Sequence, residues 1–202
     1  MADEPSLGLR ERKKRDTRKA LSDAALELMF ERGLENVVRE DIAERAGVSV
    51  RTFNNYFAGK YEALAYRHIE RVRRSAELLL ARPDDEPIWT ALTEALIEPL
   101  RDDGAGGPPT AAMLAETRKL QAAPEMQAVT AKAVGDDLVA AVAQRTGTAP
   151  GDLYPKLVAA TVNAAHLVVL ESYTQSDPPV PITTLLREAL TQLSRGLPEP
   201  GN

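Results

Sequence analysis

Three polar side chains in one short segment have the chemistry needed to recognise base pairs. Arg51, Asn54 and Asn55 lie within a predicted helix from Val50 to Tyr56, and they form its polar face. An arginine can donate two hydrogen bonds to guanine O6 and N7, and an asparagine can pair with adenine N6 and N7. None of the three has an evident packing role. The pattern favours a helix that reads the major groove of DNA.

The residues before this helix have the layout of a helix-turn-helix motif, over about residues 38–57. A short helix at 40–46 is expected to end at Gly47, because glycine readily adopts the positive φ of a tight turn. We expect Val48 to fill the corner between the two helices. Ser49 is expected to cap the second helix by accepting a hydrogen bond from a backbone N–H.

Helical spacing of apolar residues recurs along the chain, and no segment shows the two-residue alternation of a strand. A first helix is expected to close at Gly33, and a longer helix follows the motif at 60–81. The remaining helices are expected at 88–101, 110–122, 125–146, 150–174 and 182–195. The sequence therefore predicts an all-α protein with about nine helices.

A polar break from Arg82 to Pro87 is the predicted boundary between two domains, at 15–75 and 83–196. The charge differs on either side of it. Residues 1–82 contain 17 Lys and Arg against 14 Asp and Glu, and residues 83–202 contain 8 against 16. Because phosphate attracts local positive charge, this asymmetry favours DNA binding by the N-terminal domain.

The composition provides few of the side chains that enzymes commonly use for catalysis. The chain has no Cys and two His, and it lacks an HExxH motif. The glycines at 104–107 follow Asp103 in a predicted loop and not a strand, so they do not form a nucleotide-binding turn. We predict that the protein is not an enzyme and requires no cofactor or metal. It has neither a secretion signal nor a long uninterrupted apolar run, so we expect a cytoplasmic protein without a membrane partner.

The segment IAERAGVSVRTFNNYFAGKYEAL resembles the N-terminal domain of the TetR family of bacterial repressors. The hallmark of that family is IAxxAGVSxxTxYxYFxxKexL, preceded by a helix of the AxxLxxxxG type, which Ala25–Gly33 matches. The resemblance covers about residues 15–75. It implies a homodimeric repressor with a helix-turn-helix domain and a C-terminal helical domain for ligand binding and dimerisation. A small-molecule inducer would release such a dimer from a palindromic operator in double-stranded DNA.

The resemblance also implies roles for residues at matching positions. By this resemblance, the residues that read bases are Arg51, Asn54 and Asn55. The residues that contact phosphates are Ser49, Thr52, Tyr56 and Lys60. The remaining DNA-binding positions are Arg39 and Val50. Two positions depart from the family pattern, since Val38 replaces a common capping threonine and Asn54 replaces a usual tyrosine. The basic arm 10–15 is expected to precede the first helix, where it either lies along the minor groove or remains a solvated tail.

Assignments in the C-terminal domain depend on general properties of its helices. An apolar helix at 150–174 and a leucine stripe at 182–195 suit a four-helix dimer contact, although burial within one subunit is the alternative. The dimer candidates are Val162, Leu167, Leu170, Leu186, Leu190 and Leu193. The ligand-pocket candidates are Trp89, Met113, Glu116, Asn163, His166 and Tyr173.

Two other functions remain open at this point. The protein is either a DNA-binding regulator or architectural factor with no small-molecule switch or, less in keeping with its residues, an enzyme. In the favoured mechanism the helix at 60–81 transmits ligand binding to the recognition helices, which requires the ligand to prefer one of two states of the dimer.

Overall fold

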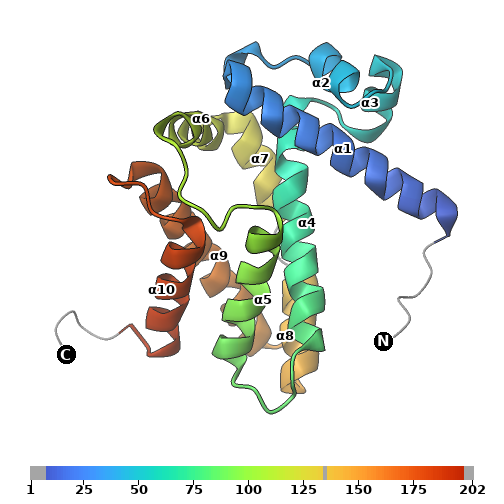
Figure 1. The fold of residues 1–202 in the computed structure, drawn as a ribbon. Helices are drawn as coiled ribbons and strands as arrows, with labels where there is room; N and C mark the ends of the chain where they lie inside the picture. Colours follow the sequence, from blue (N-terminus) through green and yellow to red (C-terminus); the bar gives the residue numbers. More distant parts are fainter. Residues whose placement is uncertain (1–7, 134–135, 198–202) are drawn as a thin grey trace. The chain divides into compact units, whose positions relative to one another are not determined.

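The computed structural model describes residues 8–133 and 136–197, and within these ranges all of the regular secondary structure is helical (Figure 1). The predicted all-α fold is confirmed. The elements are α1 (Leu9–Arg32), the 3-10 helix η1 (Leu34–Asn36), α2 (Arg39–Arg45), α3 (Val50–Tyr56), α4 (Lys60–Ala81), α5 (Ile88–Asp102), α6 (Ala111–Ala122), α7 (Pro124–Ala133), α8 (Asp136–Thr146), α9 (Leu153–Gln175) and α10 (Ile182–Ser194).

Two helices differ from the prediction. The helix expected at 125–146 corresponds to two helices, α7 and α8, so the described residues contain ten α-helices where about nine were expected. The basic arm 10–15 does not precede the first helix, because α1 already begins at Leu9. Arginine, lysine and glutamate are good helix formers, so nothing in the arm ends the helix before residue 10.

The chain divides into two compact units. Unit 1 contains residues 1–68 and 119–130, and unit 2 contains residues 69–118 and 131–202. Helix α4 contributes its first two turns to unit 1 and the rest of its length to unit 2.

The core of unit 1 fixes the three N-terminal helices to one another. Helix α1 buries Leu21, Ala25 and Leu28, which recur at the spacing of one helix face. Ile42 of α2 and Phe53 of α3 are fully buried in the same cluster. The recognition segment is thus held by apolar packing on its inner side.

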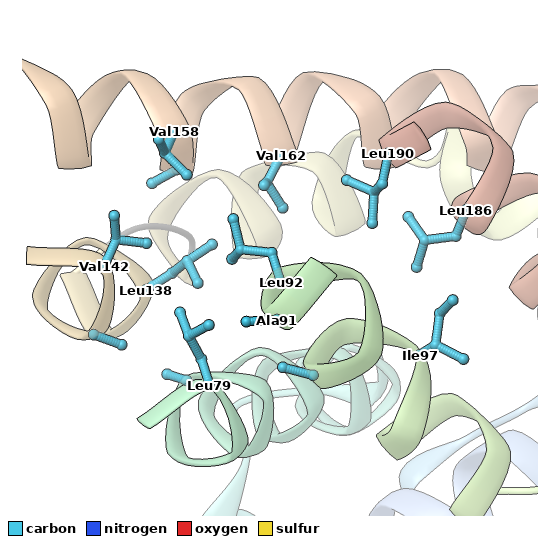
Figure 2. Close-up of a cluster of buried hydrophobic side chains, with 14 of the residues drawn as sticks. Leu79, Ala91, Leu92, Ile97, Leu138, Val142, Val158, Val162, Leu186 and Leu190 are labelled. Carbon is cyan, nitrogen blue, oxygen red and sulfur yellow. The ribbon is translucent and has the colours of Figure 1, made fainter. Parts of the chain in front are cut away.

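The core of unit 2 is formed by α4, α5, α8, α9 and α10 (Figure 2). Leu79, Leu92 and Val142 are fully buried, and Val162 of α9 and Leu190 of α10 pack into the same cluster. These aliphatic side chains hold α9 and α10 against α5.

The loop between α4 and α5 is held by the Arg82–Glu86 ion pair and by Arg145 of α8. The Arg145 guanidinium on α8 donates to the backbone carbonyls of Leu79 at 3.3 Å, Arg82 at 3.0 Å and Glu86 at 3.0 Å. The last carbonyls of a helix have no partner within it, so this arginine satisfies the end of α4 and orders the polar loop.

Helix α9 is buried on one side only within the single chain. Val158, Val162 and Val169 face the core, whereas Leu157, Leu167 and Val168 are more than half exposed. The alternative of burial within one subunit therefore does not hold for this second side of α9. By length and composition α9 is apolar enough to cross a membrane, but the core helix of a soluble protein passes the same test, so this is weak evidence for a membrane span.

Candidate nucleic-acid interface

Helices α2 and α3 form the predicted helix-turn-helix, joined by the turn at 46–49. Gly47 adopts a φ of 68°, the left-handed conformation that the turn was expected to need. The Val48 N–H donates to the Ala43 carbonyl at 2.9 Å, which closes the turn onto α2. The angle between the two helices is therefore set by local bonds in addition to core packing.

Ser49 caps α3, as predicted. Its Oγ accepts a hydrogen bond from the Thr52 N–H at 3.1 Å, and its hydroxyl lies 2.9 Å from Thr52 Oγ1. Phe53 is fully buried and anchors the inner side of the helix. Capping and anchoring together stabilise a helix that is too short to be stable alone.

The outer face of α3 consists of the three polar residues predicted to read bases. Arg51, Asn54 and Asn55 are exposed, and their spacing places them on one face of the helix. Val50, Thr52 and Tyr56 are half-buried at the border of this face, and Ser49 and Arg39 are exposed nearby. An exposed arginine beside two asparagines can make hydrogen bonds to the edges of bases in a major groove.

Arg18 holds the C-terminal end of α3, a contact that the sequence analysis missed. Its guanidinium donates to the Tyr56 carbonyl at 3.3 Å and lies 5.5 Å from the Phe57 ring centroid and 5.4 Å from that of Tyr66. These cation–π contacts join α1, α3 and α4. No sequence motif indicates them, because the residues are distant along the chain.

Lys60, predicted to contact phosphate, is half-buried and bound to the backbone. Its Nζ donates to the carbonyls of Leu34 at 2.8 Å and Val37 at 3.1 Å. In this arrangement the lysine ties the start of α4 to the segment just before α2. Val38, at the N-cap of α2, is 47% exposed and provides no side-chain cap.

Ion pairs attach α2 to α1. The Arg45 guanidinium donates two hydrogen bonds to the Glu31 carboxylate, at 2.7 and 2.9 Å, and one to Glu27 at 3.3 Å. The bond from Arg45 lowers the pKa of Glu31 below its usual value. Arg32 and Asp41 form a second pair at 3.2 Å. Arg45, at the end of α2, and Arg32, at the end of α1, are therefore both paired with carboxylates of the same chain.

In unit 2, three ligand-pocket candidates lie on one side of α9. Asn163, His166 and Tyr173 are half-buried there. Burial lowers the pKa of His166, and the charge of Arg71 on α4 lowers it further. Burial also raises the pKa of Tyr173, which the same Arg71 charge opposes. His166 and Tyr173 therefore both lie within the electrostatic influence of Arg71.

Arg71 itself was not predicted. Its Nε donates to Asp103 Oδ2 at 2.6 Å, and both side chains are about three-quarters buried. Of the other candidates, Trp89 packs half-buried against the core of unit 2, and Met113 and Glu116 lie half-buried on α6. The polar groups around Arg71 come from α9 and from the end of α5, which are distant from Arg71 in the sequence, so no local pattern reveals them.

The dimer candidates differ in where their side chains lie. Val162, Leu186 and Leu190 are buried in the core of the same chain, so their side chains are not available to a partner without rearrangement. Leu170 and Leu193 are half-buried, and Leu167 is 61% exposed. The apolar surface that α9 offers instead comprises Leu153, Leu157, Leu167 and Val168.

The residues that the structure describes combine a capped helix-turn-helix with a second helical unit, which is the architecture of a DNA-binding transcription regulator. Residues 21–65 match the family model described as bacterial regulatory proteins, tetR family. Residues 86–198 match the model of the MftR C-terminal domain, a TetR C-terminal domain. The chain belongs to the TetR family of transcriptional regulators.

Relatives agree with this assignment. The HTH-type transcriptional regulator TcmR of Streptomyces glaucescens is 31% identical over 179 residues, covering 84% of this chain and 79% of TcmR. FadR of Thermus thermophilus, solved with lauroyl-CoA, has a TM-score of 0.55 and 22% identity, covering 92% of this chain and 100% of that one. SmeT of Stenotrophomonas maltophilia has a TM-score of 0.54 and 22% identity, covering 93% and 96%.

Proposed function

We propose that this protein is a homodimeric, cytoplasmic repressor that binds a palindromic operator through α3 and leaves it when a small-molecule inducer binds. The observation that carries the proposal is the exposed polar face of Arg51, Asn54 and Asn55 on a helix capped by Ser49. Base edges would be read by these three side chains, and Thr52, Tyr56 and Arg39 would contact phosphates. Two recognition helices related by two-fold symmetry would lie about 34–36 Å apart.

The ligand site is proposed in unit 2, beside the Arg71–Asp103 pair. Its polar groups are Asn163, His166 and Tyr173, carried by an otherwise apolar helix. Such a site suits a ligand with a large apolar part and a few hydrogen-bonding groups. Two structural relatives support a ligand, since Thermus thermophilus FadR was solved with lauroyl-CoA and SmeT with triclosan.

The dimer contact is proposed on the exposed apolar face of α9. Leu157, Leu167 and Val168 are each more than half exposed in the single chain. Apolar surface of this kind is stabilised when a second copy covers it, at about 25 cal/mol per Å². We therefore assign the interface to this face and not to the buried Val162.

The experiment that tests the function is binding-site selection from random double-stranded DNA, followed by mobility-shift titration of the selected duplex. We expect a palindromic site bound by a dimer. A library of largely apolar compounds with a few hydrogen-bonding groups is then added to the protein–DNA complex. We expect one class of compound to release the protein from the duplex. If the selection recovers no preferred sequence, the proposal of a sequence-specific repressor is contradicted. If no compound releases the protein, the result favours a regulator without a small-molecule switch.

A further inference from the structure

The first turns of α1 form an exposed and strongly basic segment at residues 10–15, which we call the basic α1 segment. Its six residues are all exposed, and they comprise five Arg or Lys and one Glu. Within the part of unit 1 that the structure describes, none of these five cations forms an ion pair, whereas Arg45 pairs with Glu31 and Arg32 pairs with Asp41. The charge of the segment is therefore available to an external anion.

No packing within unit 1 accounts for the length of this helix. The first fully buried side chain of α1 is Leu21, and residues 9–16 are exposed throughout. Eight residues of α-helix extend for about 12 Å. Like charges three and four residues apart destabilise a helix, so a polyanion that neutralises them would stabilise this extension.

The direction of the basic α1 segment is fixed relative to the recognition helix. Arg18 binds the Tyr56 carbonyl at the C-terminal end of α3, and the Ser22 hydroxyl donates to the Ala63 carbonyl of α4 at 2.6 Å. Because α1 is continuous, the segment ends about one turn before Arg18 and extends from there toward the N-terminal end of α1. A major groove that receives α3 is about 12 Å wide, so phosphates that border it lie within reach of the segment.

We propose that the basic α1 segment is a second DNA-contact element, which binds phosphates that flank the base pairs read by α3. This inference rests on the proposed function of α3. A helix is about 10–12 Å in diameter, and the minor groove is only about 6 Å wide. The segment therefore lies across the sugar-phosphate backbone instead of entering the minor groove, and it adds affinity without reading bases.

The test removes two charges from the segment in the full-length protein. Lys13→Gln/Lys14→Gln keeps helix propensity nearly unchanged. The matched control, Arg74→Gln/Arg101→Gln, removes the same charge from exposed side chains of unit 2. Both are titrated with fluorescent duplexes that carry the site selected from random DNA. One duplex ends at the palindrome, and the other has about 10 more base pairs on each side, one helical turn.

On the longer duplex we expect the slope of log Kd against log salt to fall by about 0.9 for each phosphate that the variant no longer binds, and so by up to about 3.6 for a dimer. The control should keep the wild-type slope, and on the short duplex the two variants should bind alike. Equal slopes for both variants on the longer duplex would overturn the proposal while leaving the role of α3 intact. Failure of the wild-type protein to bind any selected duplex would overturn both.

Discussion

The outer face of α3 and the outer face of α9 are both exposed in the single chain, but they differ in chemistry. On α3 the exposed groups are an arginine and two asparagines, whose hydrogen bonds water satisfies until a base replaces it. On α9 they are Leu157, Leu167 and Val168, which water does not satisfy. The polar face is stable when unoccupied, whereas the apolar face would be stabilised by a partner that covers it. This is the difference expected between the reversible DNA contact and the lasting protein contact that we propose.

The largest expected effect comes from placing charge on the apolar face. Leu157→Asp/Leu167→Asp should convert the dimer to a monomer in light scattering. Operator affinity should fall by about 100-fold or more, because the two half-sites are then bound independently. The control is Thr90→Asp/Gln144→Asp, which adds the same charge to exposed positions of α5 and α8. A dimer that persists in the first variant would place the interface elsewhere.

A smaller effect is expected from the polar face. Arg51→Ala should weaken operator binding by about 1–3 kcal/mol and relax the preference at one base pair. Arg51→Lys keeps the charge but removes the planar guanidinium fork, so it should also relax the same base preference while retaining the salt dependence. Titration of duplexes substituted at each position measures both. An unchanged base preference in the two variants would exclude Arg51 from base reading.

The caps of the helix-turn-helix provide a third comparison. Ser49→Ala should lower the free energy of unfolding by about 1 kcal/mol, because the Thr52 N–H then has no side-chain acceptor. Val38→Thr should raise it by about the same amount, because α2 has no side-chain cap. Urea unfolding measures both changes. Val38→Ala is the control for the removal of an exposed valine, and an equal gain in that variant would contradict the capping explanation.

The smallest effect concerns His166 in unit 2. Burial and the Arg71 charge lower its pKa in the folded state, so the unfolded chain binds more protons below the ordinary histidine pKa. The contribution to stability is complete above about pH 6.5 and is lost as the pH falls toward the folded-state value. His166→Gln should therefore lose less stability than wild type between neutral and mildly acidic pH in urea unfolding. An identical pH dependence in the variant and the wild type would contradict the assignment.

Much of the helix-turn-helix could be predicted because its determinants are local. Gly47, Ser49 and the polar face of α3 lie within a few residues of one another, and turn chemistry, capping and helix period act over that range. The bounds of α2 and α3 follow the prediction closely for the same reason. The start of α1 was predicted too late because a run of charges suggested a separate arm, although arginine and lysine favour helix.

Contacts between distant segments could not be predicted. The Arg18 contacts with Tyr56 and Phe57, and the hydrogen bond from Lys60 to the Leu34 carbonyl of η1, join residues separated by more than twenty positions. The sequence by itself determined the helical class, the recognition motif and the polar groups available to DNA. Only the tertiary structure decided which face of α9 is buried and which polar groups surround Arg71. The physical reason is that side-chain burial depends on which helices pack together, and helix period alone does not select the partner.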